Sequence, residues 1–146
     1  MTGIDRNSMF DRILPILPEF GAELQALKED YLASPHAVPP APDFPYYGAA
    51  NALAHRVITL LENHQTDTIK DVFAVLEDWL LQGDDFVSEV ATIGLIEDLQ
   101  NGNLHPSTQP ADLVGLLGPE GRYWWMKVER FWLHGEIIHD DRVRQD

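Results

Sequence analysis

Residues 69–85 read IKDVFAVLEDWLLQGDD, and this stretch decides the class of fold. Its apolar side chains recur at steps of three and four residues, which places them on one face of an α-helix: Ile69, Val72, Phe73, Leu76, Trp79 and Leu80. Asp71 and Asp78 project from nearly the opposite side, and Glu77 lies at the boundary between the two faces. The pattern predicts an amphipathic helix over about 68–81, with one buried and one solvated face.

Gly83 and the two aspartates after it follow this helix, and the pair Asp84 and Asp85 can be read in four ways. Two aspartates can ligate a metal ion, act as general acid and base, cap a helix, or belong to a charged surface that meets another molecule. Gly83 suits the left-handed residue that ends a helix, and an aspartate after it suits the N-cap of the next helix, which contributes about 1 kcal/mol. We expect one aspartate to be this cap and the other to face solvent beside Glu89.

The rest of the chain reads as helices separated by stop signals, and no stretch alternates as a strand does. Helical spacing predicts further helices at about 9–17, 20–31, 50–63, 85–99, 111–117 and 120–133. Pro15 and Pro18 bend or divide the first two of these. Residues 34–47 contain five prolines and are predicted to be an ordered, extended connector. We predict a single all-α domain over residues 1–146, a compact bundle of about six to seven helices.

Three segments form a degenerate internal repeat, each with a glutamate that follows aliphatic residues near a turn: Glu62, Glu77 and Glu97. This repeat suggests stacked antiparallel helix pairs of an α-solenoid kind as a variant of the bundle. Glu97 continues the apolar ridge of its helix, so we expect it to be partly buried and to require a hydrogen-bond donor. The candidate donors are Arg56, Arg122, Lys127 and a tyrosine hydroxyl.

Composition limits the partners that this domain can bind. The 146 residues include 24 acidic and 10 basic ones, for a net charge of −14, and the stretch from Val57 to Gly121 holds only one base, Lys70. Such a field opposes direct binding to nucleic acid or to an anionic membrane, and it favours a basic partner. Without cysteine, a signal-like N-terminus or a long apolar segment, the sequence leads us to expect a cytoplasmic protein.

The sequence lacks the motifs of common catalytic and metal sites. It has no G-x-S-x-G, no phosphate-binding glycine loop and no H-E-x-x-H. His134 and His139 are spaced so that they would point to different sides of a helix, and we expect this C-terminal tail to fray at the surface. We predict a protein that is not an enzyme and that binds neither a metal ion nor a cofactor.

An aromatic run, RYWWMKVERFW at residues 122–132, covers a broader face than one packing stripe requires. We expect most of its aromatic side chains to lie in the core. Tryptophan and tyrosine are favoured as interface anchors, so an exposed member of this run would be a candidate contact residue.

Several segments occur in a recognisable order along the chain. These are LPEF at residues 17–20, the proline-rich connector, LED and LIEDL on either side of a GDDFV turn, and LLGPEGRYWW at residues 116–125. The order resembles small acidic all-helical bacterial immunity proteins, which neutralise polymorphic toxins of the Rhs and secretion-system type. The resemblance implies a protein that binds one cognate toxin domain and blocks its active site or the entry of its substrate.

The charge and the resemblance together favour an inhibitor of a basic toxin, such as a nuclease or a nucleic-acid-modifying enzyme. We expect a monomer that forms a 1:1 complex, with the contact made chiefly by outward acids: Asp71, Asp78, Asp85 and Glu89. Two alternatives remain open at this point, a helical-repeat adaptor for other proteins and an enzyme that uses carboxylates or histidines.

Overall fold

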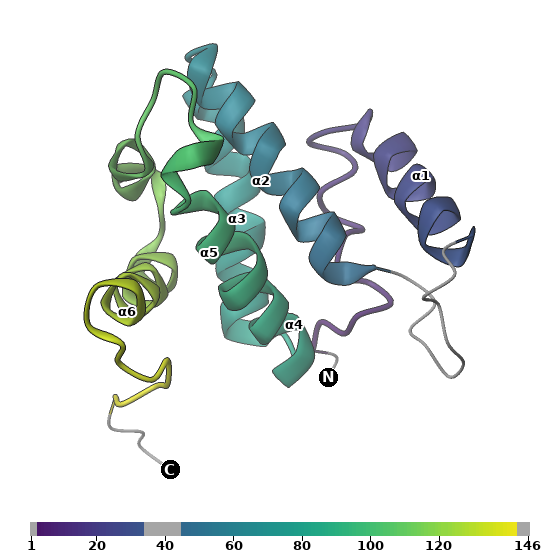
Figure 1. Cartoon of the computed structure of the whole chain (residues 1–146). Helices are drawn as coiled ribbons and strands as arrows, with labels where there is room; N and C mark the ends of the chain where they lie inside the picture. Colours follow the sequence, from purple (N-terminus) through teal and green to yellow (C-terminus); the bar gives the residue numbers. More distant parts are fainter. Residues whose placement is uncertain (1–2, 34–44, 143–146) are drawn as a thin grey trace.

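The computed structural model describes residues 3–33 and 45–142 and shows an all-α fold (Figure 1). Its elements are α1 (Phe20–Ala33), α2 (Tyr46–Glu62), α3 (Thr66–Gln82), α4 (Asp85–Glu89), the π-helix η1 (Val90–Ile96), α5 (Glu97–Leu99), the 3₁₀-helices η2 (Gly102–Leu104) and η3 (Pro110–Leu116), and α6 (Pro119–His134). The prediction of a compact all-α fold is confirmed. In the described ranges, no helix has the length and apolarity that a membrane span requires. The predicted connector falls mostly on residues 34–44, outside the described residues.

The helices surround one shared core. Figure 1 shows α2, α3 and the run α4–η1–α5 at the centre, with α1 on one side of them and α6 on the other. The π-helix η1 packs against α2, α3 and α6, while α3 packs against both α2 and α6. In a solenoid each repeat contacts only its neighbours along the chain. The cross-contacts of η1 and α3 are therefore those of a bundle and not of a stack of helix pairs.

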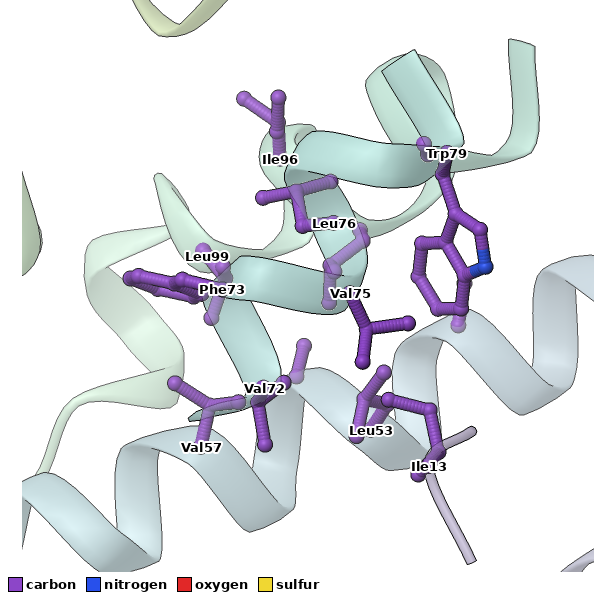
Figure 2. Packing of buried hydrophobic residues seen from close by; sticks show 14 of the residues in the cluster. Ile13, Leu53, Val57, Val72, Phe73, Val75, Leu76, Trp79, Ile96 and Leu99 are labelled. Atoms are coloured by element: carbon purple, nitrogen blue, oxygen red, sulfur yellow. The ribbon is translucent and has the colours of Figure 1, made fainter. Parts of the chain in front are cut away.

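The apolar face predicted for residues 69–80 forms the middle of this core. Figure 2 shows Val72, Phe73, Val75, Leu76 and Trp79 of α3 close to Leu53 and Val57 of α2, with Ile96 and Leu99 nearby. Trp79 is only 1% exposed, and its indole Nε1 donates a hydrogen bond of 2.9 Å to the carbonyl oxygen of Met9. Leu80 is the one predicted member of the face that is only partly buried.

The N-terminal segment differs from the helix predicted at residues 9–17. It consists of successive turns, in which Asp11 N–H donates to the carbonyl of Ser8 at 3.1 Å and Ile13 N–H to that of Phe10 at 3.0 Å. Pro15 lacks an N–H group and cannot continue an α-helical ladder. The apolar spacing was nevertheless informative about burial, since Met9, Phe10 and Ile13 all lie in the core.

The prediction that Gly83 is left-handed is wrong. Its φ of −69° and ψ of 148° are those of an extended residue. Ile4 forms a short bridge here, donating its N–H to the Gln82 carbonyl and accepting from the Asp84 N–H, both at 2.9 Å. Glycine is required for space, since a Cβ would lie 2.3 Å from the Trp79 carbonyl oxygen. The predicted cap is confirmed, because Oδ1 of Asp84 accepts a hydrogen bond from Val87 N–H at 2.9 Å.

The helix predicted over residues 85–99 is present as one continuous helical run, but its middle is π-helical. Within it, Thr92 Oγ1 donates a hydrogen bond of 2.8 Å to the carbonyl of Ser88, four residues earlier. The sequence does not predict this change of helix type, because the segment VATIGLI is apolar almost throughout and therefore shows no period.

Two of the three glutamates of the internal repeat hold other segments in place. Glu77 accepts hydrogen bonds from the backbone N–H groups of Glu120 at 2.9 Å and Gly121 at 2.7 Å, so it caps the N-terminus of α6 from α3. Glu62 accepts from Ser107 N–H at 3.1 Å, from the Ser107 hydroxyl and from Thr108 Oγ1 at 3.0 Å, and the bond from the Ser107 hydroxyl is the main reason that the pKa of Glu62 is lowered. Both glutamates therefore bind chain segments that are remote in sequence.

Glu97 is partly buried as expected, but the prediction that one of the candidate side chains donates a hydrogen bond to it is wrong. Arg56 pairs with Glu23, Lys127 pairs with Asp141, and Arg122 donates to the Gly115 carbonyl. Across residues 3–33 and 45–142, no side chain donates a hydrogen bond to Glu97. Burial, followed by repulsion from Asp98, raises the pKa of Glu97.

Replacing Glu77 with alanine should lower the free energy of unfolding by about 2 kcal/mol, because two N–H groups at the start of α6 would lose a charged acceptor. Glu77→Gln keeps an acceptor oxygen and should have a smaller effect. Urea denaturation followed by circular dichroism measures the change. The control is Asp71→Ala on the solvent face of the same helix, for which we expect a change within about 0.5 kcal/mol. Equal effects of the two alanine variants would show that Glu77 is not the cap of α6.

Candidate functional site

A groove of about 740 Å³ lies between the C-terminal end of α3, the α4–η1 run and α6. Its apolar lining consists of Leu80, Leu81, Ile93, Trp124 and Ile138. Its carboxylates are Asp85 and Glu89 from α4, Glu120 from α6, and Asp140 from the segment that follows α6. We call this hollow the acidic groove. It combines an apolar lining with four carboxylates and one cation, Arg142.

The structure places two of the four predicted contact residues in the acidic groove. Asp85 and Glu89 lie one turn apart on α4, and both are exposed. The hydroxyl of Tyr47 on α2 is hydrogen-bonded to Glu89, and burial followed by the Glu89 charge raises the pKa of Tyr47. The short helix α4 can present these acids to solvent because Val87, on its other side, is fully buried.

The other two predicted residues do not line this groove. Asp71 is exposed on α3. Asp78 forms an ion pair with Arg12, and its side chain is 28% exposed. Its charge is therefore matched within the chain, where it ties the N-terminal turns to α3. A role for Asp71 or Asp78 in partner binding stays a prediction.

Sequence reasoning missed the wall of the groove that is formed after α6. The tail was expected to fray, but its residues 136–142 fold back along α6. Arg142 donates hydrogen bonds to Glu120 Oε1 at 3.0 Å and to Asp140 Oδ2 at 2.9 Å, and its guanidinium lies 3.9 Å from the centre of the Tyr123 ring. The sequence signal that could have indicated this docking is Ile138, which packs against the core, followed by two aspartates and an arginine.

Ion pairs set the charge state of the docked segment. The hydrogen bonds from Arg142 hold the pKa of Asp140 well below its ordinary value. Lys127, with a smaller contribution from Tyr123, lowers the pKa of Asp141 to about 2. Among the described residues that line the acidic groove, four carboxylates therefore face a single cation, Arg142, and the groove is negative at neutral pH.

Acid should release the segment 136–142 from α6. A carboxylate whose pKa is depressed in the folded state stabilises it above the unfolded pKa, about 3.9 for aspartate, and this contribution is lost as the pH falls through the folded value. For Asp141 the window is from about pH 4 to about pH 2. NMR relaxation of the amides of residues 136–142 should show increased motion over this range, before the amides of α3 change. Asp141→Asn should show the same motion at pH 7, and a segment that stays rigid in this variant would contradict the assignment.

No set of three or more histidine, aspartate and glutamate side chains within residues 3–33 and 45–142 is arranged to hold a metal ion. Two carboxylates of the acidic groove interact with other side chains of the protein, Glu89 with Tyr47 and Glu120 with Arg142. This arrangement can bind a cationic group by charge and hydrogen bonding, and it can bury an apolar group on its floor.

Comparison with known proteins places the chain in a family. The model of a family described as "Domain of unknown function (DUF7674)" matches residues 10–133. Neither a curated protein nor a solved structure matches the chain.

Proposed function

Since the chain belongs to the DUF7674 family, whose function is unknown, we propose from its own surface that it is a stoichiometric inhibitor of a basic protein, a cognate bacterial toxin domain. It acts by binding and not by catalysis, as a monomer in a 1:1 complex, without a metal ion or cofactor. The place of this action is the cytoplasm.

The acidic groove is the observation that carries the proposal. Its lining includes the exposed carboxylates Asp85 and Glu89, and one of its apolar residues, Leu81, is 61% exposed. In protein complexes, charges at the rim steer the partner and select it, while buried apolar and aromatic anchors supply most of the affinity. A surface with both properties suits a basic protein that inserts an apolar side chain.

The net charge of −14 supports a toxin that acts on nucleic acid. Enzymes of this kind carry positive surfaces that bind phosphates. An acidic protein can cover such a surface and compete with the nucleic acid for it. The resemblance of the sequence to immunity proteins supports the same choice over a general adaptor.

Capture from the native host tests the proposal. The tagged full chain serves as bait, beside Asp85→Lys with Glu89→Lys and a control with the same charge change on α1, Glu29→Lys with Asp30→Lys. We expect the wild type and the control to retain one dominant basic protein in a 1:1 ratio, and the groove variant to lose it. The captured domain should arrest growth when it is expressed alone, and co-expression of the wild-type chain should restore growth.

Two outcomes would contradict this function. Many partners captured in similar amounts would indicate an adaptor. A single partner that causes no growth arrest, or whose effect the chain does not relieve, would show that the complex is not one of toxin and inhibitor.

A further inference from the structure

The last turns of α6 expose apolar side chains that the core does not use. Trp132 is 58% exposed and Leu133 is 68% exposed, whereas Trp125, two turns earlier, is buried. Residues seven and eight positions apart lie on the same side of a helix, so these three side chains form one apolar ridge along α6. The aromatic run is therefore only partly a core element.

A second groove, of about 660 Å³, runs along this ridge, between α6 and the segments that contain α5 and η3. All three side chains of the ridge line it, together with Val114 of η3. We call it the tryptophan groove. It lies on the opposite flank of α6 from the acidic groove, since Glu120 and Trp124 line the acidic groove while Trp125 and Glu129 line this one.

The charges of the tryptophan groove have one sign. Its lining includes Glu97, Asp98 and Glu129, and none of its described lining residues is basic. Asp98 accepts a hydrogen bond of 3.1 Å from Asn51 Nδ2, whereas Glu97 has no donor among the described side chains. A partly buried carboxylate without a donor is unfavourable, and a cation brought by another molecule would remove this cost.

We propose that the tryptophan groove binds a basic amphipathic helix of a partner protein. The apolar face of that helix packs on Trp132 and Leu133, and its arginine or lysine side chains meet the three carboxylates. Trp132 and Leu133 are an exposed apolar edge at the end of α6, continued into the groove by the buried Trp125, and a second helix can pack there with its side chains between those of α6. This proposal rests on the proposed function, which supplies the basic character of the partner. It adds a second contact with that partner, on the other flank of α6.

Charge argues against the other occupants of this groove. A second copy of the chain would bring a net charge of −14 to a rim that is already acidic, and an anionic membrane would be repelled in the same way. A basic helix is the occupant that satisfies both the exposed apolar ridge and the carboxylates around it.

A synthetic peptide of 18 residues tests the site, with leucines on one face of its helix and lysines and arginines on the others. Its affinity for the full chain is measured by fluorescence anisotropy of a label on the peptide. We expect Trp132→Ala and Glu129→Lys each to weaken binding by about tenfold. Asp30→Lys on α1 changes the charge by the same amount as Glu129→Lys, and it should change the affinity by less than about threefold.

Several results would overturn this site. Unchanged affinity for Trp132→Ala would exclude the ridge, and an equal loss for Asp30→Lys and Glu129→Lys would show diffuse charge attraction. Dimerisation of the wild type that Trp132→Ala abolishes, or binding to neutral phosphatidylcholine vesicles, would identify a different occupant. Failure of the peptide test, with capture of a toxin still lost in the acidic-groove variant, would reject the tryptophan groove alone and leave the proposed function standing.

Discussion

Replacing Trp79 with alanine should lower the free energy of unfolding by about 4 kcal/mol, the largest effect that we expect from a single substitution. The side chain is 1% exposed and lies in the middle of the core (Figure 2). Its removal would leave a cavity next to Met9 and Phe10 of the N-terminal turns, in addition to the loss of buried apolar area. A loss of this size is a large part of the stability of a domain of this length.

Trp79 also joins the N-terminal segment to α3. Its Nε1 hydrogen bond to Met9 and the edge-on contact of its ring with Phe10, with centroids 5.7 Å apart, hold turns that have no helical ladder of their own. Trp79→Phe should therefore cost less than the alanine variant and loosen residues 5–17 in particular. Urea denaturation measures the first effect and amide hydrogen exchange the second.

Leu81→Ala, on the same helix, is the matched control for Trp79. Leu81 is 61% exposed, so its truncation should change the free energy of unfolding by no more than about 0.5 kcal/mol. Similar losses in the two variants would mean that the core is not organised around α3 as the structure shows.

Reversing both charges on α4, with Asp85→Lys and Glu89→Lys, should weaken binding of the basic partner by about 100-fold. The substitutions place two cations in the acidic groove, and like charges opposed across an interface cost several kcal/mol. Isothermal titration calorimetry with the captured toxin domain measures the affinity. Asp85→Asn with Glu89→Gln removes the charges without adding new ones, and it should fall between the wild type and the lysine variant.

The pair Glu29→Lys and Asp30→Lys controls for total charge. Both residues are exposed on α1, and α1 and α6 lie on opposite sides of the central helices (Figure 1). We expect this variant to change the affinity by less than about threefold. An equal loss of affinity in the two double-lysine variants would mean that only the total charge matters, and the acidic groove would then not be the binding site.

Apart from residues 9–17, which form turns, the sequence predicted the helices because the period of apolar residues reports directly on burial. Residues 69–80 and the cap at Asp84 depend on local spacing and local hydrogen bonds, and both were predicted correctly. Gly83 was assigned to the wrong conformation because its constraint comes from Ile4, 79 positions away, and from the close Trp79 carbonyl. A one-dimensional pattern does not contain such contacts.

The candidate site was predictable to the extent that it lies on one helix. Asp85 and Glu89 were predicted to share an outward face because they are one turn apart on a short amphipathic segment. Glu120 joins them because α6 packs against α3 and η1, and Asp140 joins them because the chain folds back after α6, where Arg142 pairs with both. The cap that Glu77 provides for α6 was missed for the same reason, since its partners lie 43 and 44 residues away.

The salt dependence of the complex tests the central claim most directly. The dissociation constant of the full chain with its captured partner would be measured from about 50 mM to about 500 mM sodium chloride, for the wild type and for Asp85→Asn with Glu89→Gln. Charge pairing at the acidic groove predicts a steep loss of wild-type affinity with salt and a clearly shallower slope for the variant. The same slope for both proteins, or a wild-type affinity that does not depend on salt, would contradict the account.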